Sequence, residues 1–200
     1  MHNPFVSIMN NKHNTTNLDI EPRKSYMALG EIYFWTATIN QWHHLMSGNN
    51  FKEVVIGSLR HLSRTGSIEV FAFVVMPNHI HLIWRINRLN GKETPQGSLL
   101  KFTAHTFKKM LLAKAPNELG KYAVLANNKE YEFWQRDSLA THLYTRAVAM
   151  QKLHYLHNNP MAKHWQLCST PAEYEYSSAH FYEGQEKRFD FLKDLRDEFW

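Results

Sequence analysis

FAFVVMPNHIHLIW, residues 71–84, consists of two hydrophobic runs separated by Pro77 and Asn78. Proline and asparagine favour tight turns, so the two runs are predicted to form a β-hairpin. Successive strand residues point to opposite faces, so His79 and His81 share one face with their Cβ atoms about 7 Å apart. Two imidazoles therefore stand where a core strand would normally place apolar side chains.

The rest of the chain supplies further elements around this hairpin. Strands are predicted at 31–39, 67–76 and 79–86 and within 131–144, and helices at 49–66, 98–115 and 145–159. Residues 117–129 are predicted to be irregular. The order β-α-β-β-α-β-α predicts an α+β fold, most economically a ferredoxin-like central antiparallel sheet with helices packed on it.

Composition bounds the kind of protein. The chain has 200 residues, a net charge of +5 and a single cysteine, Cys168. This length suits one domain, the modest positive charge suggests a polyanionic partner, and one cysteine excludes an internal disulfide framework. No run approaches the roughly 20 apolar residues of a membrane span, and the N-terminus lacks a secretory pattern, so a cytoplasmic protein without membrane contact is expected.

The chain is divided into three parts by composition. Residues 1–28, rich in Asn and Thr, are predicted to be a loosely ordered N-terminal arm, and 29–183 a single domain. The stretch FDFLKDLRDEFW within 184–200 has an amphipathic pattern and is predicted to be a C-terminal helix.

The histidine pair has two interpretations. Imidazoles two residues apart on a strand can converge on one divalent ion, because imidazole is a common ligand for transition metals. Alternatively, the strand is half exposed and its polar face carries histidines in a chain that has 13 of them. The bare His-x-His pattern leaves both open.

Longer motifs resemble a known family. VVMPNHIHLIW resembles the signature of the IS200-type transposases of the HUH superfamily, in which two histidines flank a hydrophobic residue. YLHNNPMAKHW, residues 155–165, resembles a block of the REP-associated tyrosine transposases in the same family. FWQRDS and AEYEYSSAHFY resemble two further family segments, so the likeness runs from about Glu31 to Tyr182.

This resemblance implies an HUH nuclease fold and a set of roles. Tyr155 would be the nucleophile, and His79 and His81 would bind a catalytic Mg²⁺ or Mn²⁺ ion. Asn159, one helical turn after Tyr155, matches the third metal ligand, although the following Pro160 also allows Asn159 to be a helix stop. Tyr131 and Tyr144 are rival tyrosines, and His157 is expected to serve packing or the surface more than the chemistry.

DNA contacts are predicted elsewhere. The helix predicted at 98–115 carries a basic stripe at i, i+4, i+7 and i+8: Lys101, His105, Lys108 and Lys109. Such a stripe suits phosphate contact, but it equally suits a solvated face. Arg136 is a further candidate, and Trp84, Trp134 and Trp165 are candidates for stacking on bases if they are not buried.

The sequence therefore predicts a metal-dependent tyrosine transposase that cleaves and rejoins single-stranded or hairpin-associated DNA through a 5′-phosphotyrosine, as a monomer or homodimer. Two alternatives remain. A catalytically silent relative would bind hairpin DNA with the same residues, and a metal phosphoesterase would use the histidines without a covalent intermediate.

Overall fold

The computed structural model describes residues 26–126, 129–136, 138–184 and 188–199. Its centre is a four-stranded sheet with the strand order β2-β3-β1-β6. These strands are β1 (Ile32–Thr38), β2 (Ile68–Val75), β3 (His79–Ile86) and β6 (Leu139–His142). Every neighbouring pair is antiparallel, so the predicted α+β fold with a ferredoxin-like sheet is confirmed.

The β2–β3 hairpin forms at the predicted turn. The N–H of Met76 donates to the carbonyl of His79 at 2.8 Å and closes the turn over Pro77 and Asn78. On β1, Thr38 lies opposite His79 and Thr36 lies opposite His81. Directly opposed residues share a face, so the two threonines accompany the histidines on one side of the sheet.

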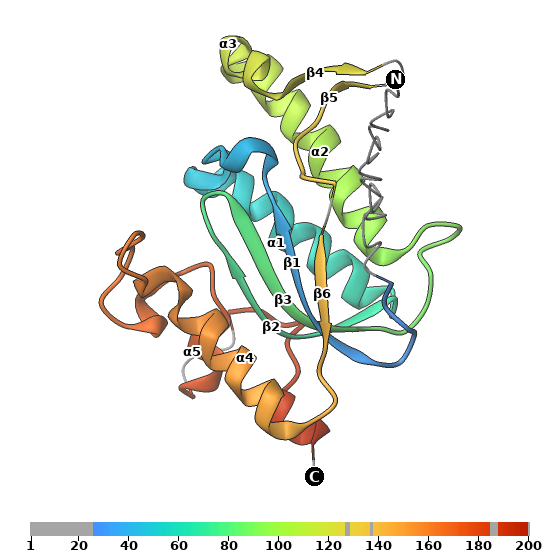
Figure 1. Ribbon diagram of the computed structural model, residues 1–200, viewed down its shortest axis with the longest axis vertical. Helices are drawn as coiled ribbons and strands as arrows, with labels where there is room; N and C mark the ends of the chain where they lie inside the picture. The colour runs from blue at the N-terminus through green and yellow to red at the C-terminus, as the bar shows by residue number, and fades with distance from the viewer. Residues whose placement is uncertain (1–25, 127–128, 137, 185–187, 200) are drawn as a thin grey trace, which may run out of the picture.

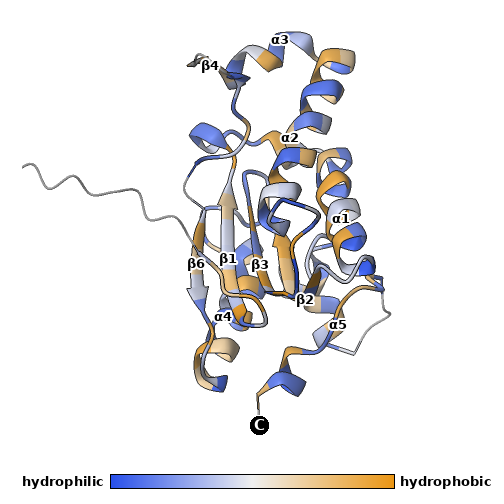
Figure 2. Ribbon diagram, turned by 90° about the vertical axis from the view of Figure 1, so that its right-hand side faces the viewer, coloured by the Kyte–Doolittle hydropathy of each residue, from blue (hydrophilic) through white to orange (hydrophobic). Residues whose placement is uncertain are grey.

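The opposite face of the sheet forms the main core. There the indoles of Trp35 and Trp84 stack with ring centroids 5.0 Å apart. Helices α1 (Asn49–Arg64) and α2 (Pro95–Lys114) contact each other, with Phe51 packing against Phe107 at 5.5 Å. Figure 2 shows hydrophobic residues along the central strands that these helices cover. Burial of this apolar surface is the principal stabilising contribution.

Helix α4 (Arg146–Asn158) packs against the face that carries the histidines, and Figure 1 shows it across the sheet from α1 and α2. Thr145 caps its first turn, because the threonine Oγ1 accepts from the N–H of Val148 at 3.3 Å. The helix buries Leu153 and Leu156, and it ends one residue before the 3-10 turn η4 (Asn159–Met161). The cap and the proline of this turn therefore bracket the helix that carries Tyr155.

One region differs from the sequence prediction. Residues 117–129, predicted to be irregular, contain part of a small two-stranded sheet of β4 (Ala123–Ala126) and β5 (Lys129–Tyr131), preceded by α3 (Pro116–Leu119) and the 3-10 turn η3 (Gly120–Tyr122). Strands this short carry too little alternation to be recognised. Tertiary contacts support them, since the rings of Tyr122 and Phe133 stack at 4.7 Å.

The predicted C-terminal amphipathic helix within 184–200 is wrong. In residues 188–199 the chain forms turns and a 3-10 helix, η6 (Leu195–Glu198). Phe189 and Phe191 are both buried and pack on Phe73 at 4.8 and 6.0 Å. Aromatic residues two positions apart reach one neighbour from an irregular backbone, whereas a helix would turn them apart.

The remaining long-range predictions have different outcomes. Of the predicted arm 1–28, residues 1–25 lie outside the described part of the chain. The division into parts stays a prediction, although Phe189, Phe191 and Leu195 join the same core as the sheet. Within the residues that the structure describes, none of the helices combines the length and apolar character that crossing a membrane requires.

Candidate active site

The two histidines of β3 form a buried pair. The ring centroids of His79 and His81 are 4.6 Å apart with an interplanar angle of 66°, and each residue is only 6% exposed. The ring of Phe34 stacks on His81 at 5.1 Å. The predicted common face is therefore confirmed, and the rings meet in an environment from which most water is excluded.

The Nδ1 atom of each ring has a partner. His79 Nδ1 lies 2.7 Å from Asn78 Oδ1, and His81 Nδ1 lies 2.7 Å from Thr36 Oγ1. Metal-binding histidines are usually held this way, with one ring nitrogen bonded to a second residue and the other left for the ion. Both Nε2 atoms thus have the arrangement expected of ligands.

Burial keeps this pair neutral. The pKa of His79 is lowered to about 4, chiefly by burial and further by nearby His164. The pKa of His81 is lowered to about 3 by burial and by the neighbouring His79 and Lys152. A metal binds only the unprotonated imidazole, so both rings are in the binding form at neutral pH.

Asn159 brings an amide to the pair. Its Nδ2 lies 3.4 Å from His81 Nε2, and its buried Oδ1 has no hydrogen-bond partner among the described residues. A buried acceptor without a protein partner is uncommon, and an amide oxygen is an acceptable ligand for Mg²⁺ or Mn²⁺. The donors present thus fit a divalent ion. Helix α4 also ends at Asn158, so the helix-stop interpretation fits as well.

A divalent ion bound here would need a third ligand of another residue type. In the described part of the chain, no group of three or more His, Cys, Asp or Glu side chains could hold a metal. The two imidazoles would have to be completed by an amide such as Asn159, by water or by the substrate.

Tyr155 lies beside the pair. Its ring is 5.5 Å from that of His81 and 6.0 Å from that of Phe34, and the residue is 50% exposed. The ammonium of Lys152, one turn earlier on α4, lies 5.7 Å from the centroid of the tyrosine ring. The helix thus brings a phenol and a cation to the two imidazoles. The rival Tyr144 packs on His142 instead, at 6.0 Å.

Solved structures place this arrangement in a known fold. A REP-associated tyrosine transposase bound to a REP hairpin superposes with a TM-score of 0.58 at 17% sequence identity, over 88% of this chain and 93% of that chain. The chain has the fold of a REP-associated tyrosine transposase. A putative transposase from Deinococcus radiodurans R1 is also similar, with a TM-score of 0.39 and 16% identity over 68% of this chain and 96% of that one, a likeness too weak for any conclusion. No protein-family profile matches the sequence, and no curated protein does.

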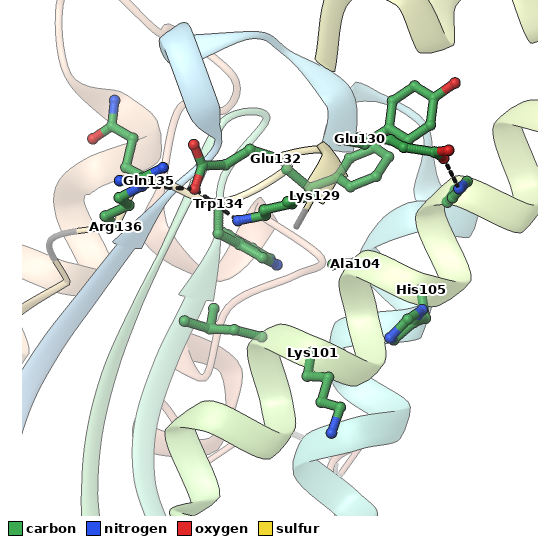
Figure 3. A pocket seen from close by; sticks show the side chains of 13 residues that line it. Lys101, Ala104, His105, Lys129, Glu130, Glu132, Trp134, Gln135 and Arg136 are labelled. Atoms are coloured by element: carbon green, nitrogen blue, oxygen red, sulfur yellow. Dashed lines mark hydrogen bonds and ion pairs between the residues drawn. The ribbon is translucent and has the colours of Figure 1, made fainter. Parts of the chain in front are cut away.

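Outside the histidine site, this transposase fold has a large basic groove. Its volume is about 930 Å³, and its walls are α2 and β5 with the segment that follows (Figure 3). Four of the five predicted DNA-contacting residues line it: Lys101, His105, Lys108 and Arg136. Lys109 is exposed but does not line the groove.

Carboxylates partly neutralise the groove. Glu130 pairs with Lys108 at 3.0 Å, and Glu132 pairs with Lys129 at 2.7 Å and with Arg136 at 3.2 Å. Among the lining residues four Lys or Arg side chains face two carboxylates, an excess of two positive charges with His105 neutral. Surface pairs of this kind contribute little to stability, so the cations can exchange these partners for a polyanion.

The wall of the groove that carries Arg136 is joined to β1. The N–H of Gln135 donates to the carbonyl of Thr38 at 2.8 Å, and Thr38 lies opposite His79. The segment that carries Arg136 thus lies against β1, and β1 alone separates it from the strand of the histidines.

Of the remaining aromatic and histidine candidates, all but Trp165 have structural contacts away from the site. Trp84 and Trp134 are buried, and Trp134 Nε1 donates to Thr103 Oγ1 at 2.9 Å. His157 Nε2 lies 2.8 Å from Ser178 Oγ, and burial, together with nearby His154, lowers the pKa of His157 to about 4. Trp165 is half-buried, with its ring 6.0 Å from that of His79, which leaves it as the one tryptophan of the three at the site.

Sequence reasoning missed the residues that support the site. Thr36 reaches His81 only through the pairing of β1 with β3, a long-range contact that no local pattern reveals. Lys129 belongs to a hairpin that was not predicted. Lys152, by contrast, precedes Tyr155 by three positions on one helix, and this spacing could have indicated it.

Proposed function

We propose that this protein is a metal-dependent DNA transposase or endonuclease that cleaves and rejoins single strands beside DNA hairpins through a 5′-phosphotyrosine. The observation that carries the proposal is the meeting of three residues: Tyr155 of α4 lies 5.5 Å, ring to ring, from His81 of β3, and Asn159 reaches the same histidine from the end of α4. The fold shared with a transposase bound to a REP hairpin supports the same reading.

In the proposed reaction, the phenol oxygen of Tyr155 attacks the phosphorus of a phosphodiester. A Tyr155–phosphate bond forms as the bond to the 3′ oxygen breaks. The phenol releases one proton and the leaving 3′ oxygen takes up one to become a hydroxyl, so protons balance over the step. A free phenol has a pKa near 10 and is a weak nucleophile while it keeps its proton, so the reaction needs an activating group.

His79, His81 and Asn159 would hold the divalent ion. When bound, such an ion polarises the phosphate and offsets the charge that develops on it. The covalent ester retains the energy of the broken bond, so attack by a 3′ hydroxyl on the phosphotyrosine reverses the step and joins strands without ATP.

The basic groove is proposed to bind the DNA backbone. Lys101, His105, Lys108 and Arg136 line it together, and the segment that carries Arg136 is hydrogen-bonded to β1, the strand next to the histidines. Lys109 would contribute from the same helix only if DNA extends beyond the groove. The protein would act in the cytoplasm as a monomer or homodimer, as its sequence predicts.

A cleavage assay on a hairpin oligonucleotide with a single-stranded flank tests the proposal. With Mn²⁺ or Mg²⁺ present, the unsubstituted protein is expected to form a protein–DNA adduct that survives denaturing electrophoresis. Tyr155→Phe is expected to abolish the adduct, whereas the matched change Tyr144→Phe is expected to leave it intact.

Other results would contradict the proposal in distinct ways. An adduct that persists in Tyr155→Phe would mean that another residue is the nucleophile. Hydrolysis of DNA without an adduct would indicate a metal phosphoesterase, and hairpin binding without any cleavage would indicate a catalytically silent relative.

A further inference from the structure

Asn78, the residue that precedes the histidine pair, has both ends of its side chain engaged. Its Nδ2 donates to the backbone carbonyl of Trp42 at 3.2 Å, and its Oδ1 lies 2.7 Å from His79 Nδ1. The residue is buried. Because an amide donates only from nitrogen and accepts only at oxygen, these two contacts fix which way the side chain faces.

The direction of these two hydrogen bonds decides which ring nitrogen of His79 carries the proton. A flipped amide would direct its oxygen at the Trp42 carbonyl, two acceptors facing each other. With the observed orientation Asn78 Oδ1 can only accept, so the proton of a neutral His79 must sit on Nδ1. Its Nε2 then carries a lone pair. Thr36 does not fix the tautomer of His81 in this way, because a hydroxyl can either donate or accept a hydrogen bond.

The loop that supplies the carbonyl is held in an uncommon conformation. Gln41 and Trp42 have φ values of 53° and 58°, in the left-handed region that residues other than glycine rarely adopt. Further hydrogen bonds fasten the loop to the hairpin turn: the N–H of Ile39 donates to the carbonyl of Asn78 at 2.7 Å, and that of Met46 to the carbonyl of Pro77 at 2.8 Å. Such strain persists only where the surroundings enforce it, and it is commonly found at functional sites.

We propose that Asn78 is a positioning residue that, anchored by the Trp42 carbonyl, holds His79 as its Nδ1–H tautomer and presents Nε2 as a metal ligand. The metal part of this inference rests on the proposed function, but the tautomer does not. Removing the residue that is hydrogen-bonded to the other ring nitrogen of a metal-binding histidine typically weakens metal binding 10- to 100-fold.

The tautomer is measured by long-range ¹H–¹⁵N NMR of ¹⁵N-histidine-labelled, metal-free protein at pH 7.5, and Mn²⁺ affinity by titration calorimetry. His79 is expected to be the Nδ1–H form. Asn78→Ala is expected to lose that preference and to bind Mn²⁺ about 10- to 100-fold more weakly. Asn158→Ala is the matched control, because Asn158 also donates to a backbone carbonyl, that of His154, at 2.8 Å.

An Nε2–H form of His79 in the unsubstituted protein would overturn the inference. The inference can therefore be tested even if Asn78→Ala does not fold. A tautomer that stays unchanged in a folded Asn78→Ala protein would overturn it too. If the unsubstituted protein has the expected tautomer but binds no Mn²⁺, the proposed metal function fails and the tautomer assignment stands.

Discussion

At the scale of single residues, some members of the candidate site can be predicted from the sequence and others cannot. The common face of His79 and His81 follows from the two-residue repeat of a strand, and the motif resemblance alone singled out Tyr155. The contact of Asn159 with His81 joins positions 78 residues apart, so it becomes visible only once α4 has docked on the sheet.

Asn159→Ala separates a ligand from a helix stop. Its Oδ1 is buried without a partner among the described residues, so removing the amide should change the free energy of unfolding of the metal-free protein by less than about 1 kcal/mol. Affinity for Mn²⁺ should nevertheless fall at least tenfold, because an oxygen ligand is lost. Urea denaturation and calorimetry measure the two quantities. Unchanged Mn²⁺ affinity with lowered stability would support the helix-stop role instead.

At the scale of elements, the long periodic segments were predictable and the short ones were not. Helices α1, α2 and α4 and the β2–β3 hairpin appear where their apolar spacing and their Pro and Asn signals predicted them. The β4–β5 hairpin and the tail at 188–199 depend on distant partners such as the α2 surface and Phe73. Such long-range contacts cannot be predicted from local sequence patterns. The groove itself could therefore not be predicted from the sequence, although all the basic α2 residues that line it were predicted.

Neutralising the groove should weaken hairpin DNA binding. A triple change of Lys101, Lys108 and Arg136 to Gln should lower affinity, and the plot of log affinity against log salt should become shallower by up to about 0.9 for each lost phosphate contact. Fluorescence anisotropy with a labelled hairpin at several salt concentrations measures both. Lys109→Gln, on the same helix but outside the groove, is the comparison and should have the smaller effect per charge. Equal effects per charge would assign DNA binding to the whole helix face.

At the scale of the whole molecule, buried histidines tie stability to pH. His79, His81 and His157 have folded-state pKa values of about 4, 3 and 4, all lowered mainly by burial, whereas unfolded histidine has a value near 6.5. The unfolded chain therefore binds more protons between these limits, so acid favours unfolding. Stability is fully present above pH 6.5 and declines as the pH falls toward 4.

Metal-free protein in EDTA should thus lose stability steeply in mild acid. Between pH 6.5 and pH 5 each of the three histidines can contribute a loss of up to about 2 kcal/mol. Urea unfolding at pH 7, 6 and 5 measures the loss, and Mn²⁺ at pH 6.5 should counter it by binding the folded state. A free energy of unfolding that stays flat from pH 7 to pH 5 would show that these rings are already accessible to protons.

The depth of the histidine pair also bears on the kind of DNA that can react. Tyr155 is half exposed, whereas the imidazoles beneath it are nearly sealed between β3 and α4. In the proposed reaction a phosphate would have to reach the imidazoles past the exposed Tyr155, and an unpaired strand is thinner and more flexible than a duplex. The protein would then select unpaired DNA by its shape, without any contact to a specific base.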